Sequence, residues 1–338
     1  MRRFLIFSMP ACALTACLLS IDESKIETGT ENTKRSDSST TTTTPSVRID
    51  SSTPPQTKDA EAPLVLPDGG RACSEGLTLC PDDVCYDTTG ELANCGTCGN
   101  VCPANQLCRA SKCVPPSSCK ELLARAPGTS TGVTNLTIAG TVLPAFCDMT
   151  TDGGGYTLVF RLSRGQPGDP YALLKGNALN DDVSVEATPQ VRTKHYVSRL
   201  LAGWNIDFPV EQVRVRLLND AGDLLRELSF DGKGTTRESW FSKAKLLTSP
   251  WNDVSAADTG FFAPAGHPDE QRRFFIHRPY KTCEEDEGWL VVHGSKAPTV
   301  CAYENPGANI RIYYAPNATA HRWSTGVPEA SSFAVFVR

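Results

Sequence analysis

The sequence has no strong excess of charge and few long apolar runs. Its 338 residues include 33 Lys and Arg against 38 Asp and Glu, which gives a formal net charge of −5. Nucleic-acid binding depends on clustered cations that neutralise phosphates, so we expect no nucleic-acid partner. Beyond the N-terminal 16 residues, no run approaches the ~18 apolar residues of a membrane-spanning helix, and none is expected.

Signatures of common catalytic sites are also scarce. The sequence contains no phosphate-binding loop, no His-Glu-x-x-His and no dinucleotide fingerprint. No nucleophile stands beside an evident base, which makes a secreted hydrolase the weakest functional class. We therefore expect that the protein is not an enzyme. Its five histidines are scattered, and each is expected on the surface or satisfied in the core: His195, His267, His277, His293 and His321.

The N-terminus has the pattern of a secretory signal. Arg2 and Arg3 precede a mostly apolar stretch that ends at Ala16, as in exported proteins. The residues Leu14-Thr15-Ala16-Cys17 resemble the lipobox of bacterial lipoproteins, in which the cysteine is acylated. An ordinary cleaved signal is the alternative. We expect a signal peptide over 1–16 and an exported protein anchored through a lipid on Cys17, with the outer membrane as the expected location.

The stretch that follows, residues 17–70, has the composition of a disordered tether. Ser, Thr, Pro, Lys and Asp dominate it, Thr40–Thr44 is a run of threonines, and residues 18–70 contain no aromatic residue. Such a segment cannot bury enough apolar surface to offset the entropy lost on ordering. We interpret it as a stalk.

The fourteen cysteines indicate an oxidising compartment. Setting Cys12 and Cys17 aside, they form even-numbered groups, which favours disulfides. The largest group, in a small module over residues 71–115, comprises Cys73, Cys80, Cys85, Cys95, Cys98, Cys102, Cys108 and Cys113. Metal binding and redox chemistry at its Cys-x-x-Cys are weaker alternatives, and the disulfide connectivity stays open. The spacing resembles Stig1-type cysteine-rich modules, which implies an extracellular spacer or interaction module.

Residues 117–338 predict an α+β domain with a mostly antiparallel sheet and long loops. Ser118 and Glu121 form a capping-box pattern before a short helix over 121–126. A second helix is expected over Val191 to Trp204. Alternation and β-rich composition predict strands at 156–162, 213–217, 225–230, 273–277, 289–293, 310–314 and 333–338.

Two stretches of this domain resemble the fibrinogen C-terminal-like family. They are Ser118-Cys119-Lys120-Glu121-Leu122-Leu123 and Cys147-Asp148-Met149-Thr150-Thr151-Asp152-Gly153-Gly154-Gly155-Tyr156-Thr157-Leu158, with Tyr156 where Trp is usual. The resemblance implies a Cys119–Cys147 disulfide. Residues 328–338 resemble the closing strand of the intelectin-like branch, and a Cys283–Cys301 disulfide is implied. The aspartates that usually form a calcium loop just before the cysteine at the position of Cys283 are absent.

The resemblance implies a lectin-like domain that binds glycans or acetylated groups, on a protein attached to the membrane by its lipid. A structural or adhesive envelope protein without a small ligand is the alternative. Ligand binding is expected near the last disulfide, at Trp289, His293, Tyr303 and Tyr313, although Trp289 and Tyr313 also fit a strand core. Calcium, if it binds, is expected at Glu284, Asp286 and Glu304, because hard cations prefer carboxylate oxygens.

Overall fold

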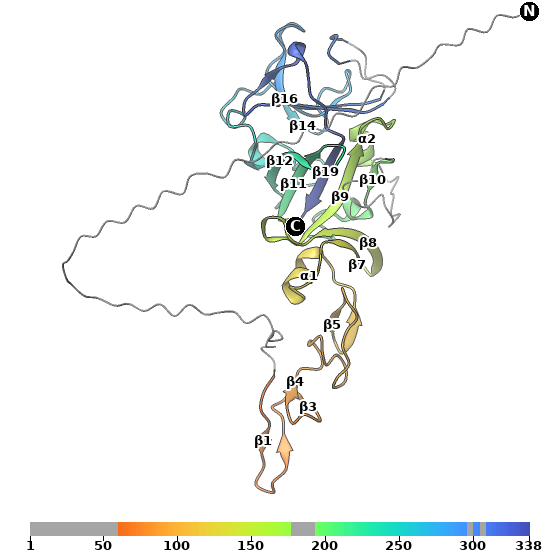
Figure 1. Ribbon diagram of the computed structural model, residues 1–338, viewed down its shortest axis with the longest axis vertical. Coiled ribbons are helices and arrows are strands. Elements are labelled where there is room, and N and C mark those ends of the chain that lie inside the picture. Colours follow the sequence, from red (N-terminus) through yellow and green to blue (C-terminus); the bar gives the residue numbers. More distant parts are fainter. Residues whose placement is uncertain (1–59, 177–192, 296–299, 305–308) are drawn as a thin grey trace, which may run out of the picture. The chain divides into compact units, whose positions relative to one another are not determined.

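The computed structural model describes residues 60–176, 193–295, 300–304 and 309–338 (Figure 1). All of them belong to one compact unit, Gln56–Arg338. The signal peptide, Cys17 and most of the expected tether lie outside the described residues. Within the described residues, no helix has the length and apolar character needed to cross a membrane.

The cysteine-rich module begins earlier in the chain than the sequence predicted. Strand β1 (Leu64–Val65) pairs with β2 (Arg71–Ala72), and Glu61 forms a bridge with Cys85. Residues 60–70, which we expected in the tether, are therefore part of the folded module. Two more antiparallel pairs complete it: β3 (Thr78–Leu79) with β4 (Cys85–Tyr86), and β5 (Leu107–Arg109) with β6 (Lys112–Val114).

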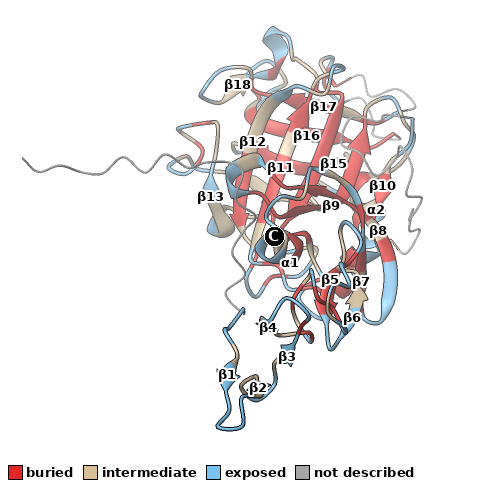
Figure 2. Ribbon diagram, turned by 60° about the horizontal axis from the view of Figure 1, so that its bottom comes forward, coloured by how far each residue is buried: buried red, intermediate tan, exposed pale blue. Residues whose placement is uncertain are grey.

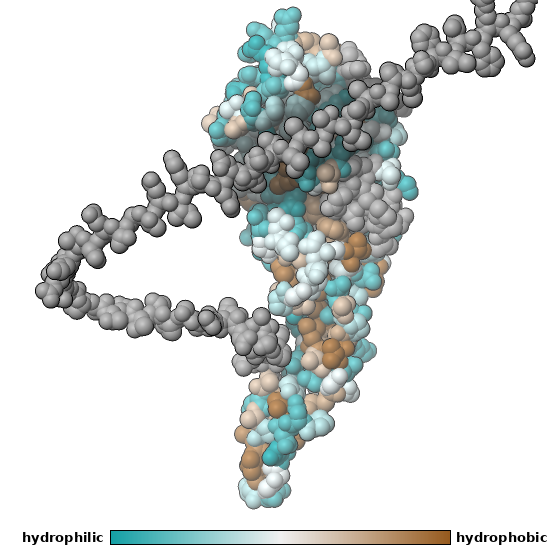
Figure 3. All heavy atoms as spheres, viewed as in Figure 1, coloured by the Kyte–Doolittle hydropathy of each residue, from teal (hydrophilic) through white to brown (hydrophobic). Residues whose placement is uncertain are grey.

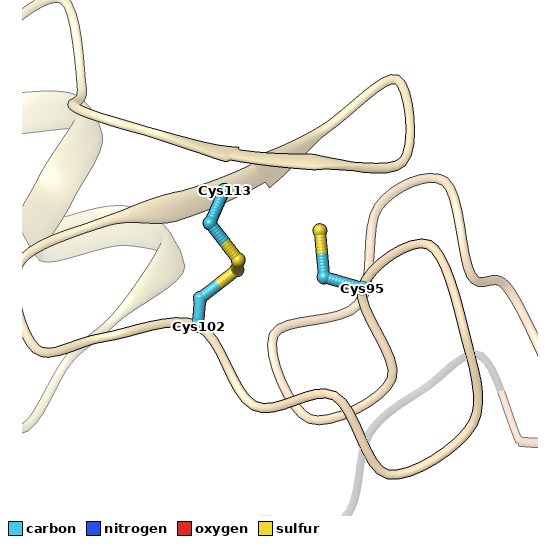
Figure 4. Close-up of side chains that lie close together, drawn as sticks. All are labelled: Cys95, Cys102 and Cys113. Carbon is cyan, nitrogen blue, oxygen red and sulfur yellow. A yellow bond between two sulfur atoms is a disulfide. The ribbon is translucent and has the colours of Figure 1, made fainter.

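All eight cysteines of this module form disulfides. The pairs are Cys73–Cys85, Cys80–Cys98, Cys95–Cys108 and Cys102–Cys113. The sulfurs of Cys95, Cys102 and Cys113 lie within 4.8 Å of one another, but Figure 4 shows the last two joined to each other. A metal would need thiolates, and these sulfurs are bonded. A Cys-x-x-Cys redox pair would join Cys95 to Cys98, which pair instead with Cys108 and Cys80. The disulfide interpretation is confirmed, and the zinc and redox alternatives are not supported.

A short helix opens the larger domain. Helix α1 (Cys119–Arg125) begins where Ser118 Oγ accepts a hydrogen bond from Glu121 N at 3.0 Å. The Glu121 carboxylate accepts a hydrogen bond from Ser117 N at 2.8 Å, one residue earlier than in a standard capping box. The Cys119–Cys147 disulfide fastens this helix to strand β8 (Thr141–Asp148), as the resemblance implied.

One antiparallel sheet forms the body of this domain. Its order is β13-β12-β11-β19-β9-β8-β7, and β10 pairs with β9. The C-terminal strand β19 (Ser332–Val337) lies in the middle, between β11 and β9. The other strands are β7 (Gly132–Ile138), β8 (Thr141–Asp148), β9 (Tyr156–Ser163), β10 (Tyr196–Val197), β11 (Gln212–Leu218), β12 (Leu224–Asp231) and β13 (Leu246–Thr248).

A second antiparallel sheet carries the region of the last disulfide. Its order is β14-β15-β16-β17, and β18 pairs with β16. The bounds are β14 (Phe261–Ala263), β15 (Arg272–His277), β16 (Glu287–His293), β17 (Arg311–Tyr314) and β18 (His321–Arg322). Helices are few and short: α2 (Pro170–Lys175) and the 3₁₀ turns η1 (Thr151–Gly153), η3 (Arg199–Gly203), η4 (Lys243–Lys245) and η5 (Trp323–Thr325).

The seven expected strands are confirmed, but the helix expected over 191–204 is wrong. In its described part, Tyr196 and Val197 pair with Arg161 and Phe160 of β9. Ser198 Oγ then caps the 3₁₀ turn η3 by accepting from Leu200 N. Strand pairing thus overrides the helical pattern in the sequence.

Aromatic side chains fill the core of the domain. Trp240, Phe241 and Phe274 are fully buried, with ring centroids of Trp240 and Phe241 5.5 Å apart. Figure 2 shows burial along β9, β11, β15 and β16. On the side in view, Figure 3 shows apolar surface in small separate areas.

The glycine turn before β9 is dictated by backbone geometry. Asp152, Gly153, Gly154 and Gly155 all have positive φ, between 45° and 82°. A Cβ on Gly154 would lie 2.0 Å from Met149 O. Only glycine fits there, which explains the repeated glycines in physical terms.

Candidate recognition pocket

A surface pocket of about 700 Å³ lies beside the Cys283–Cys301 disulfide. Strand β17 contributes two side chains, the turn η5 contributes two, and loops supply the rest. Its walls are formed by Cys283, Glu284, Ala302, Tyr303, Arg311, Tyr313, Trp323, Ser324, Gly326, Val327 and Glu329. A surface pocket thus lies in the region where the sequence predicts ligand binding, and the binding itself stays a prediction.

Local hydrogen bonds tie the loops of this recognition pocket together. Ser324 Oγ donates to Glu284 O at 2.9 Å, and Trp323 N donates to Asp286 O at 3.0 Å. The disulfide joins the Cys283 loop to Cys301. The wall is thus held by a crosslink and by backbone contacts, which limits the ordering that a ligand would have to impose.

A buried ion pair supports the loop that carries Tyr303. Arg272 and Glu304 are 3% and 0% exposed, and Arg272 Nε donates to Glu304 Oε1 at 2.6 Å. The other carboxylate oxygen accepts from Val300 N and Cys301 N, both at 2.7 Å. Glu304 is therefore fully engaged in holding the 300–304 segment.

Tyr303 and Tyr313 are fixed in the pocket wall by their hydroxyls. Tyr303 donates to Asp286 Oδ2 at 3.2 Å, and Tyr313 donates to Glu304 O at 3.0 Å. Burial, reinforced by nearby carboxylates, raises the pKa of Tyr303 well above its usual value, although Arg272 opposes this. Both hydroxyls therefore act as hydrogen-bond donors at neutral pH.

The structure separates the expected ligand-binding residues into two groups. Tyr303 and Tyr313 line the pocket, and so does Glu284. Trp289 does not: it is 0% exposed and its Nε1 donates to Asp253 Oδ1 at 2.7 Å, so its role is in the core. His293 is also fully buried and absent from the pocket wall, so its expected ligand contact is wrong.

His293 is unusual because neither ring nitrogen has a hydrogen-bond partner among the described residues. Burial, together with the positive charges of Arg272 and Arg311, lowers its pKa to about 3. Burial likewise lowers the pKa of His277 to about 4. Both rings are neutral at pH 7. Neither lines the pocket, but the His293 ring lies 5.4 Å from that of Tyr313, and the His277 ring 6.3 Å from that of Trp323.

The three carboxylates expected to bind calcium are not assembled. Among the described residues, the only group of three or more possible ligands with atoms within 4.8 Å is the trio of disulfide-bonded cysteines. Asp286 accepts from Lys281 N and Tyr303, while Glu304 is held by Arg272. Glu284, Asp286 and Glu304 therefore do not form the expected calcium site. The carboxylates of Asp286 and Glu304 instead hold neighbouring parts of the protein in place.

Sequence reasoning missed the ion pair that forms one edge of the pocket. Arg311 pairs with Glu329, and Arg311 and Tyr313 share one face of β17. The alternation of β17 could have suggested this face, but Glu329 is remote in sequence and meets Tyr313 only through a β-bridge. Val327 and Ala302 add apolar wall.

The sequence also contains a match to a nucleophile motif, but the secondary structure around it is not that of a nucleophile elbow. Gly128-Thr129-Ser130-Thr131-Gly132 has Gly-x-Ser-x-Gly spacing. A nucleophile elbow needs a strand followed by a helix, whereas this segment follows helix α1 and enters strand β7. It therefore gives no support to hydrolase chemistry.

The fold and the pocket define a disulfide-rich protein of mostly antiparallel sheets with few helices. The six disulfides among the described residues indicate an extracellular or exported protein. No protein-family model matches the chain, and no curated protein matches it.

Among solved structures, the chain is similar to the fibrinogen-like globe domain of human ANGPTL6. The TM-score is 0.36 and the identity 14%, over 67% of this chain and 96% of that chain. It is also similar to the fibrinogen-like globe domain of human ANGPTL2, with a TM-score of 0.33 and 11% identity, over 66% and 99% of the two chains. These similarities name no ligand for this chain.

Proposed function

We propose that this protein is an envelope lipoprotein whose fibrinogen-like domain recognises glycans or acetylated groups in the recognition pocket. The observation that carries the proposal is the pocket itself, beside the disulfide, with a partly exposed Tyr303 and the paired charges of Arg311 and Glu329. Sugars bind proteins through aromatic surface together with hydrogen-bonding polar groups, and this wall offers both.

An acetyl group suits the same wall. Its methyl group would pack against Ala302 and Val327, and its carbonyl oxygen would accept from the Arg311 guanidinium. Because two of the three expected carboxylate ligands, Asp286 and Glu304, are occupied by protein contacts, we propose that recognition does not require calcium. The binding domain performs no chemistry on its ligand in this proposal.

The second candidate is an adhesive or structural protein without a small ligand. It is favoured by one observation: Trp323 and Tyr313 are only 1% and 3% exposed, so their rings offer little free surface. A glycan array distinguishes the two candidates. The mature chain is applied with calcium and with a chelator, and paired spots carry glucosamine and N-acetylglucosamine.

The proposal expects selective signals that persist in the chelator and weaken in Tyr303→Ala. Tyr171→Ala is a matched control, because Tyr171 is also half-buried and donates to a carboxylate, Glu238, at 2.7 Å outside the pocket. Signals that are absent from the whole array would favour the adhesive protein. Signals that disappear only in the chelator would show that recognition requires calcium.

The anchoring part of the proposal rests on the N-terminal residues. Mass spectrometry of the mature N-terminal peptide should show a lipid on Cys17. A free N-terminus elsewhere would contradict lipoprotein processing without affecting the recognition pocket.

A further inference from the structure

A second pocket lies in the body of the domain, far along the chain from the last disulfide. It measures about 310 Å³ and is formed around the glycine turn, β9, β11, β12 and Arg338. Asp152, Tyr156, Glu211, Gln212 and Arg214 are among its lining residues. We call it the turn pocket. None of its lining residues belongs to the recognition pocket.

The turn pocket offers no aromatic surface to a sugar. Tyr156 is 1% exposed, and the guanidinium groups of Arg214 and Arg338 lie 4.0 and 5.5 Å from its ring centroid. Its hydroxyl is also engaged, because Arg214 Nη2 donates to it at 3.1 Å. A ligand would therefore be held by charge and hydrogen bonds.

The positive side of the turn pocket has unused capacity. Within the described part of the chain, Arg338 forms no ion pair with a carboxylate; its Nη1 donates to the carbonyls of Asp152 and Gly154, at 3.5 and 3.2 Å. Arg214 is 3% exposed and already pairs with two carboxylates of the pocket wall, Asp152 at 2.8 Å and Glu227 at 3.4 Å. Arg338 is therefore the cation of this pocket that is available to an anionic group of a ligand.

The negative side has free capacity as well. The side chains of Asp152 and Glu211 are 66% and 53% exposed. In each, one carboxylate oxygen forms an ion pair: Asp152 Oδ2 with Arg214 at 2.8 Å, and Glu211 Oε2 with Lys120 at 2.7 Å. The second oxygen of each group can accept from an ammonium. These acids also disfavour a plain anion such as phosphate by repulsion.

We propose that the turn pocket binds a free α-amino acid. Its carboxylate is held by Arg338, with the side-chain amide of Gln212 as a second donor, and its ammonium lies between Asp152 and Glu211. Backbone contacts hold Arg338 beside both acidic residues: its Nη1 donates to Asp152 O at 3.5 Å, and its main-chain oxygen accepts from Glu211 N at 2.8 Å. A pocket lined by a cation and by carboxylates matches a zwitterion better than a singly charged molecule.

The test is saturation-transfer NMR on the mature full chain with the twenty standard amino acids. The best binder is then compared with its deaminated acid and with its amide, which remove one charge each. We expect the amino acid to bind at least tenfold more tightly than either analogue. Arg338→Gln should abolish its advantage over the amide, and Glu211→Gln should reduce its advantage over the acid.

Arg322→Gln is the control, because Arg322 is an exposed arginine outside the pocket. Asp152→Asn supplies a second acidic-side variant, since Asn tolerates the positive φ of this position. Absence of binding by all twenty amino acids would overturn the proposal. Equal binding of the acid analogue, or unchanged affinity in folded Arg338→Gln, would overturn it too. Tyr303→Ala should leave this binding intact.

Discussion

The module over residues 60–115 and the domain over residues 117–338 are held together by different means. The module has one buried apolar cluster of its own, Cys95, Cys102 and Cys108, packed by Leu92 and Cys113, and its Leu107 is buried in the core of the larger domain. Four crosslinks therefore supply most of the module's own stability. The larger domain has an aromatic core and two disulfides. The comparison teaches that crosslinks replace a core where the chain is too short to build one.

Reduction should break the comparison most strongly. Each disulfide contributes ~2–4 kcal/mol, so the reduced module should unfold completely while the sheets persist. Hydrogen exchange measured by mass spectrometry, with and without reductant under native conditions, reports both regions at once. A reduced module that stays protected would show that it has a core of its own.

A change in the aromatic core should instead destabilise the larger domain. Trp240→Ala removes a fully buried ring and should cost about 3–5 kcal/mol of unfolding free energy. Leu247→Ala, at a side chain 55% exposed, is the control and should cost less than about 0.5 kcal/mol. Urea unfolding followed by tryptophan fluorescence measures both. Equal costs would refute the assigned core.

The buried ion pair behind the recognition pocket sharpens the comparison within the larger domain. Arg272→Met leaves Glu304 charged and unpaired, which should cost about 3–5 kcal/mol. Adding Glu304→Gln should recover much of this stability, because the buried charge is gone. Thermal unfolding of the two variants and the wild type tests the pair. No recovery in the double variant would point to a packing role for Arg272 alone.

Acid should weaken the larger domain through its buried histidines, whereas the described module contains no histidine. Folded-state pKa values of about 3 for His293 and about 4 for His277 lie below the ordinary value of 6.5. Below pH 6.5 the unfolded chain therefore binds more protons than the folded chain does. As the pH falls from 6.5 toward the folded pKa of each histidine, the free energy of unfolding decreases by about 1.4 kcal/mol per pH unit for each group.

Urea midpoints at pH 7.5 and pH 5.5 measure this loss. His293→Leu should show a smaller difference between the two pH values than the wild type does. An unchanged difference would mean that His293 is not neutral in the folded protein.

Much of the fold could be predicted from local signals. The alternating residues of β11 and the glycine turn gave the strands, and the residues around Cys147 implied the Cys119–Cys147 pairing that the structure contains. The module's connectivity could not be predicted, because eight cysteines close together in sequence allow many pairings of similar loop length. The helix expected over 191–204 is likewise wrong, because Tyr196 and Val197 pair with strand β9 in spite of the local helical propensity.

The pocket lies near the disulfide at which the sequence predicted ligand binding, but its wall differs from the predicted set of residues. Tyr303 and Tyr313 were found because polar and aromatic residues gather around the last disulfide. Trp289 and His293 were misplaced because six of the seven residues of β16 are buried, so alternation along it does not mark an exposed face. Arg311 and Glu329 meet only through tertiary contacts, which single-sequence patterns do not reveal.

The most direct test of ligand recognition is to fill the recognition pocket. Val327→Trp places a large ring in its wall, and Val133→Trp places the same ring at an exposed position of β7 outside it. Calorimetry then measures the affinity for the strongest acetylated glycan from the array. The account predicts at least a tenfold loss in Val327→Trp and none in Val133→Trp. Equal affinity in both folded variants would contradict recognition at this pocket.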